Sequence, residues 1–366
     1  MKSNYDFLVI GGGIAGLGVA SHLAKHGKAC VLEQESSLGY HSSGRSAAIF
    51  IRNYGNKVLK QLTASSETFF NNPEGIADHS LLSPRGEMLV ATENELEDLE
   101  AYLSDATDME SLTTKEACDL VPILRPEKIA AAAIETEAQD IDSDLLLQGY
   151  IRLIKSHGGH IKPKQHVQKI SYENGVWTLT TPDESYEAPI LINAAGAWAD
   201  HIATLANIPQ IGLMPKRRSM AVIPAPSGYD SSDWPLFASA SEDWYAKPQG
   251  EKLYISPADE DIVEPHDAWA DDMVLAEGLY RYEEMVTAPV TQVEHSWAGL
   301  RNFVKDKTPV VGFDNHASGF FWLAGQGGYG IQTAPALSEI ACDLITGKID
   351  SRPNDLLEAL TPNRLR

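Results

Sequence analysis

Residues 5–33, YDFLVIGGGIAGLGVASHLAKHGKACVLE, decide the fold of this 366-residue chain. An apolar run ends at Gly11, a helical pattern extends to about His26, and a second apolar run covers Lys28–Glu33. A strand, a glycine turn, a helix and a second strand within about 30 residues form a βαβ unit, which implies a parallel sheet. The stretch therefore predicts an α/β fold with a Rossmann-like domain.

Inside this stretch, residues 11–16 (GGGIAG) match the dinucleotide-binding pattern G-x-G-x-x-G. Gly11 permits a tight turn, Gly13 lets the backbone approach a pyrophosphate, and Gly16 lets helix and strand pack closely. The N-terminus of the helix then faces the negative charge of the ligand. Glu33 follows at the end of the second strand, where an acid can bind ribose hydroxyls and favours an unphosphorylated ribose over NADP.

A second glycine turn, Gly327–Gly330, lies far downstream between a predicted strand at 319–324 and a predicted helix at 332–346. Two distant glycine turns, each followed by a helix, indicate a ligand long enough to reach both. The partial positive charge of a helix N-terminus suits the negative charge that a reduced isoalloxazine ring develops. The first motif alone leaves FAD and NAD both open.

Between the two glycine turns, the predicted elements change from mainly helices to mainly short strands along the chain. Helical patterns are found at 58–70, 93–103, 115–121 and 144–156, and a strand pattern at 86–91. Strands at 162–170 and 176–181 flank the turn Glu173-Asn174-Gly175, which is typical of a β-hairpin. Another buried strand is expected at 189–194. Short aromatic strands and one helix, at 271–287, indicate an antiparallel sheet in residues 219–296.

These patterns predict two discontinuous domains. A Rossmann-like cofactor domain with a parallel sheet is expected from residues 1–80, 140–218 and 297–366. An α+β substrate domain built on an antiparallel sheet is expected from residues 81–139 and 219–296. The cofactor domain is thus interrupted twice by parts of the substrate domain.

The composition excludes several classes of function. The formal net charge is −22, and such a surface repels phosphate backbones, which argues against a nucleic-acid partner. No apolar run approaches the roughly 18–20 residues that span a bilayer, and the N-terminus shows no signal-peptide pattern. We therefore expect no integral membrane segment and a cytoplasmic protein. Cys30, Cys118 and Cys342 are scattered without C-x-x-C spacing, so neither disulfides nor a metal site are expected.

Five blocks together resemble the D-amino acid oxidase superfamily of flavoproteins, and its bacterial D-amino acid and D-arginine dehydrogenases most of all. The blocks are 11–16 (GGGIAG), 41–48 (HSSGRSAA), 193–198 (NAAGAW), 297–301 (WAGLR) and 326–333 (QGGYGIQT). They occur in the same order as in the family and span nearly the whole chain. The resemblance implies an FAD-binding domain and an amino acid substrate.

The resemblance also implies FAD without a covalent link, although His41 occupies a place where some relatives attach the flavin. Glu33 is expected on the adenosine ribose, Val167 at the adenine through its backbone, and Arg45 in an anion contact. The residues implied to contact FAD are Gly11, Gly13, Ile14, Ala15, Gly16, Glu33, Gln34, His41, Ser42, Ser43, Arg45, Ser46, Ala47, Ala48, Val167, Ala195, Gly196, Trp198, Arg301, Gly327, Gly328, Tyr329, Gly330, Ile331 and Gln332.

An amino acid substrate needs its carboxylate held while its α-hydrogen faces the flavin. Arginine suits this task because its planar fork presents parallel donors, and the family places such an arginine at Arg301. Tyr245, on an aromatic strand, can donate its hydroxyl to the same carboxylate. The resemblance adds Tyr54, on an active-site lid, and Arg218, which it favours over two basic neighbours.

Glu87 bears on the choice of substrate, because it matches the acid that meets the guanidinium group in D-arginine dehydrogenases. Ile49 and Ile51 stand where the family carries more polar pocket residues, and they favour bulkier apolar or mixed side chains instead.

The resemblance implies FAD-dependent oxidative deamination of a small amino acid, most of all a D-amino acid, which could be basic. Hydride passes from Cα to flavin N5, and the resulting imino acid hydrolyses to a 2-oxo acid and ammonia. Glycine or an N-methyl amino acid is the alternative substrate, and a flavoprotein without an amine substrate is a further one. The residues leave open the handedness, the oligomeric state and the electron acceptor, which is a quinone, another acceptor or O2.

Overall fold

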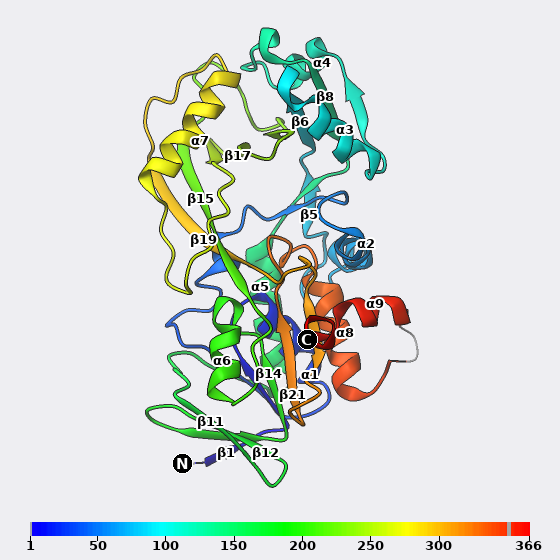
Figure 1. Cartoon of the computed structure of the whole chain (residues 1–366), viewed down its shortest axis with the longest axis vertical. Coiled ribbons are helices and arrows are strands. Elements are labelled where there is room, and N and C mark those ends of the chain that lie inside the picture. Colours follow the sequence, from blue (N-terminus) through cyan, green and yellow to red (C-terminus); the bar gives the residue numbers. More distant parts are fainter. Residues whose placement is uncertain (1, 350–352) are drawn as a thin grey trace.

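The computed structural model describes residues 2–349 and 353–366, and the lower half of Figure 1 is built on a six-stranded sheet in the order β10-β3-β2-β14-β21-β20. The strands are β10 (His160–Lys162), β3 (Ala29–Leu32), β2 (Phe7–Ile10), β14 (Ile190–Asn193), β21 (Phe320–Ala324) and β20 (Val310–Phe313). All neighbours are parallel except β20, which runs antiparallel to β21. The expected α/β fold with a parallel sheet is confirmed.

Both faces of this sheet are covered, which explains why its strands read as continuous apolar runs. Phe7 and Val9 pack into one core with the helices α1 (Ile14–Leu23), α5 (Ser143–Ser156) and α8 (Ala334–Thr346). Leu8 and Ile10 point to the opposite face, because successive side chains of a strand alternate. That face packs against a four-stranded sheet of β1 (Lys2–Asn4), β13 (Ser185–Ala188), β12 (Val176–Thr180) and β11 (Lys169–Glu173).

The upper half of Figure 1 contains an eight-stranded sheet in the order β19-β15-β18-β17-β16-β6-β8-β7. The strands are β19 (His295–Phe303), β15 (Met214–Pro224), β18 (Lys252–Ser256), β17 (Tyr245–Gln249), β16 (Leu236–Ser239), β6 (Glu87–Ala91), β8 (Ala131–Glu135) and β7 (Glu110–Leu112). All pairs are antiparallel except β16 with β6. The helices α4 (Thr114–Leu120) and α7 (Asp272–Met285) contribute to its core.

The two halves are joined by continuous strands. β15 and β19 pair from Met214 with Phe303 to Val222 with His295, so the expected boundaries at 218 and 297 fall inside this pair. A small sheet of β4 (Ile49–Phe50), β9 (Gln139–Ile141) and β5 (Leu82–Pro84) makes a further connection. The remaining helices are α2 (Lys57–Asn71), α3 (Leu96–Ser104), α6 (Ala199–Leu205) and α9 (Asn354–Leu360).

One expected strand is wrong. The strand predicted at 162–170 is two separate strands, β10 and β11, which belong to different sheets. Pro163 lacks a backbone N–H, and Lys164 adopts a left-handed φ of 59°, so the ladder cannot continue through them. The hairpin turn that follows is confirmed: Asn174 and Gly175 have φ values of 53° and 83°, as a two-residue hairpin turn requires.

A search of the described residues for a helix that is both long and apolar enough to cross a membrane finds none.

Candidate cofactor and substrate site

Three adjoining cavities lead from the parallel sheet to the eight-stranded sheet. The first, of about 800 Å³, opens at the carboxyl ends of β2 and β3, where open α/β sheets bind ligands. The second, of about 130 Å³, shares five lining residues with the first: Gly13, Ser42, Ser43, Ala194 and Gly196. The third, of about 100 Å³, shares seven with the second: Ser46, Ala47, Arg218, Tyr245, Arg301, Gly328 and Ile331.

The glycine turn after β2 shapes the first cavity. A Cβ at Gly11 would lie 2.2 Å from the carbonyl oxygen of Ala194, and a Cβ at Gly16 would lie 1.9 Å from the carbonyl oxygen of Gly11. Gly13 caps α1 without a side-chain hydrogen bond, so the N-terminus of this helix faces the cavity through its backbone. The close packing that the motif predicted is therefore present.

Glu33 is held at the wall of the first cavity by backbone donors. Its Oε2 accepts a hydrogen bond from the N–H of Gly12 at 2.6 Å, and its Oε1 accepts one from the N–H of Glu35 at 2.8 Å. Only 8% of the residue is exposed. The carboxylate thus has a defined orientation beside the expected ribose.

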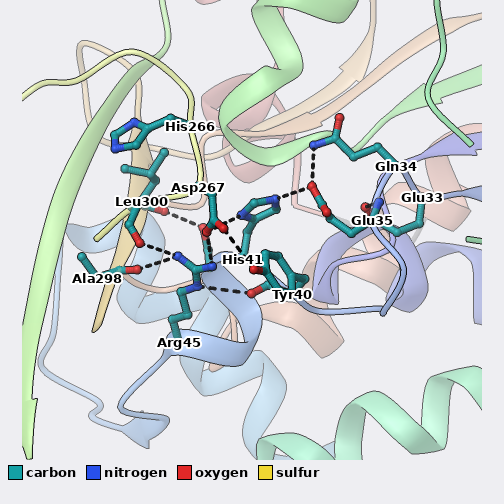
Figure 2. Close-up of polar contacts among 12 residues, drawn as sticks. Glu33, Gln34, Glu35, Tyr40, His41, Arg45, His266, Asp267, Ala298 and Leu300 are labelled. Carbon is teal, nitrogen blue, oxygen red and sulfur yellow. Dashed lines mark hydrogen bonds and ion pairs between the residues drawn. The ribbon is translucent and has the colours of Figure 1, made fainter. Parts of the chain in front are cut away.

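His41 and Arg45 sit in a polar cluster beside the first cavity (Figure 2). Arg45 Nη1 donates to the carbonyl oxygens of Ala268 at 2.8 Å and Ala298 at 2.9 Å, and its Nη2 pairs with Asp267. Asp267 and two backbone carbonyls thus occupy the guanidinium of Arg45, and its expected contact with the cofactor stays a prediction. His41 Nε2 lies 3.1 Å from Oε1 of Glu35.

The second cavity carries buried polar atoms that lack a partner in the described part of the chain. Oδ1 of Asn302 and Nε2 of Gln326 are both buried without a hydrogen bond, and both residues line this cavity. One is an acceptor and the other a donor, so the wall is complementary to a polar, flat ligand edge. Sequence reasoning missed both residues, although each lies in or beside a block that resembles the family.

Arg301 occupies the junction of the second and third cavities. Its Nη1 donates to the hydroxyl of Tyr54 at 3.0 Å, and Tyr54 stacks against Tyr329 with ring centroids 4.6 Å apart. Tyr245 lines both cavities as well. Burial acts to lower the pKa of Arg301, but the neighbouring phenols outweigh it and raise the pKa above its ordinary value. The side chain is therefore a permanent, partly buried cation.

Among the three consecutive basic residues at 216–218, Arg218 alone lines the second and third cavities. Its Nε donates to the carbonyl oxygen of Asp259 at 2.9 Å, and its Nη2 lies 3.2 Å from Oε1 of Glu260. Arg217 instead pairs with Asp259 and Asp261, and Lys216 with Glu260. The residue favoured by the resemblance is the one that faces the site.

Glu87 forms the far end of the third cavity with Tyr102 and Glu242, two residues that sequence reasoning missed. Burial, followed by the charges of Glu135 and Glu242, raises the pKa of Glu87 to about 8. The Tyr102 hydroxyl faces this carboxyl group and acts against the rise of its pKa. Glu135, directly opposite on β8, accepts bonds from the N–H groups of Arg52 and Asn53 instead. Glu87 therefore presents a neutral carboxyl group at pH 7.

The three cavities bring together nearly all the residues expected from the sequence. The first is lined by Gly11, Gly13, Glu33, Gln34, His41, Ser42, Ser43, Val167, Ala195, Gly196 and Trp198. The second adds Ile14, Ala15, Arg45, Ser46, Ala47, Arg301, Gly327, Gly328, Gly330 and Ile331. The third adds Ala48, Ile49, Ile51, Tyr54, Glu87 and Gln332. Gly16 and Tyr329 line none of them. Gly16 lets α1 pack closely against the glycine turn, and the ring of Tyr329 packs against that of Tyr54.

Comparison with known proteins identifies a family and several relatives. The family model described as FAD dependent oxidoreductase (DAO) matches residues 6–344. Glycine oxidase of Bacillus subtilis (strain 168) is 23% identical over 368 residues, which are 95% of this chain and 95% of that protein. Mitochondrial dimethylglycine dehydrogenase of Homo sapiens is 23% identical over 390 residues, which are 99% of this chain but 44% of that protein. This chain thus spans less than half of that relative.

A solved structure shares the whole fold. The crystal structure of L-proline dehydrogenase from P. horikoshii superposes with a TM-score of 0.85 at 20% sequence identity, covering 100% of this chain and 98% of that one.

Proposed function

The chain belongs to the DAO family of FAD-dependent oxidoreductases, and from this premise we propose that it oxidises a small amino acid, most of all a D-amino acid, at the α-carbon. FAD is its cofactor, and the cavities fit this molecule on two observations. The first cavity combines a glycine turn at the N-terminus of α1 with the fixed carboxylate of Glu33. The second offers the unpaired polar atoms of Asn302 and Gln326 to the flavin.

The observation that carries the proposal is the position of Arg301. This partly buried cation lines both the flavin cavity and the cavity beyond it. Within the described residues no carboxylate forms an ion pair with it, and its one hydrogen bond goes to Tyr54. A partly buried arginine without a carboxylate partner is suited to receive one from a ligand, in the parallel-fork geometry that guanidinium favours. Tyr54 and Tyr245 add hydroxyl donors beside it.

Bound FAD supplies the acceptor for a hydride from the substrate Cα. The protein itself contributes by orienting the substrate. Arg301 and the two tyrosines hold the carboxylate at the junction of the cavities, which places the Cα–H bond toward the flavin side and the side chain toward Glu87. Loss of the α-hydride together with an amine proton leaves an imino acid. Water then releases ammonia and the 2-oxo acid.

The far half of the third cavity supports a substrate that has a side chain. Glycine would leave the space bounded by Ile51, Tyr102 and Glu87 unfilled. Ile49 and Ile51 offer apolar surface, and below pH 8 Glu87 offers a neutral carboxyl group. Neutral side chains therefore suit the site at pH 7, whereas a cationic side chain must first displace the proton of Glu87.

An anaerobic screen of D- and L-amino acids, glycine and sarcosine tests the proposal. Bleaching of the flavin absorbance near neutral pH by D-amino acids with apolar or mixed side chains is the expected result. Reduction by glycine or sarcosine alone would favour the alternative substrates, which are glycine and N-methyl amino acids. Failure of every amino acid and N-methyl amino acid would contradict the proposal. Reoxidation by O2 or by a quinone in the same cuvette identifies the acceptor.

A further inference from the structure

Lys247 is a buried cation that the proposed chemistry does not use. It lies on β17 two residues after Tyr245 and therefore on the same face of the strand. Its side chain is only 4% exposed. Its Nζ donates to the carbonyl oxygen of Ala47 at 2.7 Å and lies 2.8 Å from Oδ1 of Asp140. Lysine is almost never fully buried unless it is paired. The Ala47 carbonyl and the Asp140 carboxylate are therefore the groups that compensate the buried charge of Lys247.

The contact with Ala47 reaches the wall between the flavin and substrate cavities. Ser46 and Ala47 line both cavities, so the turn 46–48 is one of the segments that the two share. Ala48 has a φ of 51°, a left-handed conformation that a residue with a Cβ holds only when its surroundings impose it. The N–H of Ile141 donates to the carbonyl oxygen of Ala48 at 2.8 Å, which fixes the turn from one side.

Lys247 fixes the turn from the other side and connects it to the rest of the molecule. Asp140 lies on β9, opposite Ile49 of β4, immediately after the turn. Its Oδ2 accepts a hydrogen bond from Nε of Arg85 at 2.8 Å. Arg85 in turn donates to the carbonyl oxygens of Ser232 and Trp234. The series Lys247, Asp140 and Arg85 therefore ties the turn to the eight-stranded sheet.

We propose that Lys247 is a positioning residue, which holds the Ala47 carbonyl and so sets how closely the bound substrate approaches the flavin. It acts through the turn and touches neither molecule. The same strand carries Tyr245 into the substrate cavity, so β17 places the carboxylate donor and the wall of the flavin site together. The part of this inference that concerns the substrate rests on the proposed amino acid oxidation. The expected effect of Lys247 on the environment of the bound flavin is independent of that proposal.

The test compares the FAD-bound Lys247→Met and Lys252→Met variants. Lys252 is a half-exposed lysine of the neighbouring strand β18, paired with Glu294, and lines none of the three cavities. Two quantities are measured: the visible absorption spectrum of the bound flavin, and the limiting rate of flavin reduction with the apparent Kd of an amino acid from the screen. For Lys247→Met we expect a shifted spectrum and a limiting rate at least about tenfold lower, with the Kd nearly unchanged.

A wild-type spectrum and rate in Lys247→Met, with only a lower melting temperature, would mean that the lysine merely stabilises the fold and would overturn the proposal. The double variant Lys247→Met/Asp140→Asn also removes the charge of Asp140, which in the single variant keeps only Arg85 as a cationic partner. It carries the same expectation and replaces the single variant if that one does not fold. If no amino acid reduces the wild-type flavin, the proposed function fails, whereas the spectral comparison still decides the role of Lys247.

Discussion

The guanidinium of Arg301 lies directly over Gly328, so close that a Cβ at position 328 would stand 2.9 Å from Nη1 and 3.0 Å from Cζ. Gly328 does not have a left-handed φ, so its need for glycine is steric. The second glycine turn and Arg301, the proposed carboxylate-binding residue, are thus one unit, in which the missing side chain of Gly328 makes room for the guanidinium.

Gly328→Ala is therefore expected to displace Arg301 and to lower kcat/KM by at least about tenfold, while Arg301→Met lowers it by at least about a hundredfold. The double variant should be no worse than Arg301→Met alone, because both changes act on one guanidinium. Steady-state kinetics of the three variants measures this. Additive losses would show that Gly328 acts independently of Arg301.

Glu87→Leu is expected to remove a pH-dependent preference for cationic side chains. In the wild type the ratio of kcat/KM for D-arginine to that for D-methionine should rise as the pH passes about 8, where Glu87 loses its proton. A charge-assisted hydrogen bond contributes about 1.5–3 kcal/mol, or roughly ten- to 150-fold in this ratio. In Glu87→Leu the ratio should stay flat, with D-alanine little affected because its methyl group is short. An identical pH profile in both proteins would exclude contact between Glu87 and the side chain.

Glu87 should also make stability pH-dependent. Its pKa is raised from an ordinary 4.5 to about 8 in the folded chain, so the native state keeps a proton that the unfolded state releases between these values. The free energy of unfolding therefore falls as the pH rises through this window, by up to about 1.4 kcal/mol per pH unit. Urea unfolding of wild type and Glu87→Gln at several pH values should show the wild type losing stability relative to the variant. Parallel pH profiles would contradict this expectation.

FAD is expected to be bound without a covalent link. His41 lines the first cavity, its Nε2 faces Glu35, and its ring lies 4.6 Å from that of Trp198, whereas the residues that line the second cavity do not include it. Acid precipitation of the protein should leave the yellow colour in the supernatant. Colour that stays in the pellet of the wild type, and is lost from the pellet of His41→Ala, would establish a covalent bond instead.

Local sequence patterns determined much of the fold of this protein. The turn 11–16 with its flanking apolar runs predicted the parallel sheet, because the φ/ψ limits of glycine and the alternation of a strand act over a few residues. The hairpin turn at Asn174 and Gly175 was predictable for the same reason. The five blocks of resemblance also pointed to Arg301 as the arginine for a substrate carboxylate, and the structure puts this residue where two cavities meet.

Tertiary structure decided which charges are paired and which are left for a ligand. Arg45 was expected to meet an anion, and it does, but the anion is Asp267, 222 residues away in sequence. Arg301 finds Tyr54 across 247 residues and no carboxylate in the described chain. The pKa of Glu87 is raised first because the fold buries this side chain, and then because β8 brings the charge of Glu135 opposite to it. The free energy of a buried charge depends on every group packed around it, and residues distant in sequence supply most of those groups.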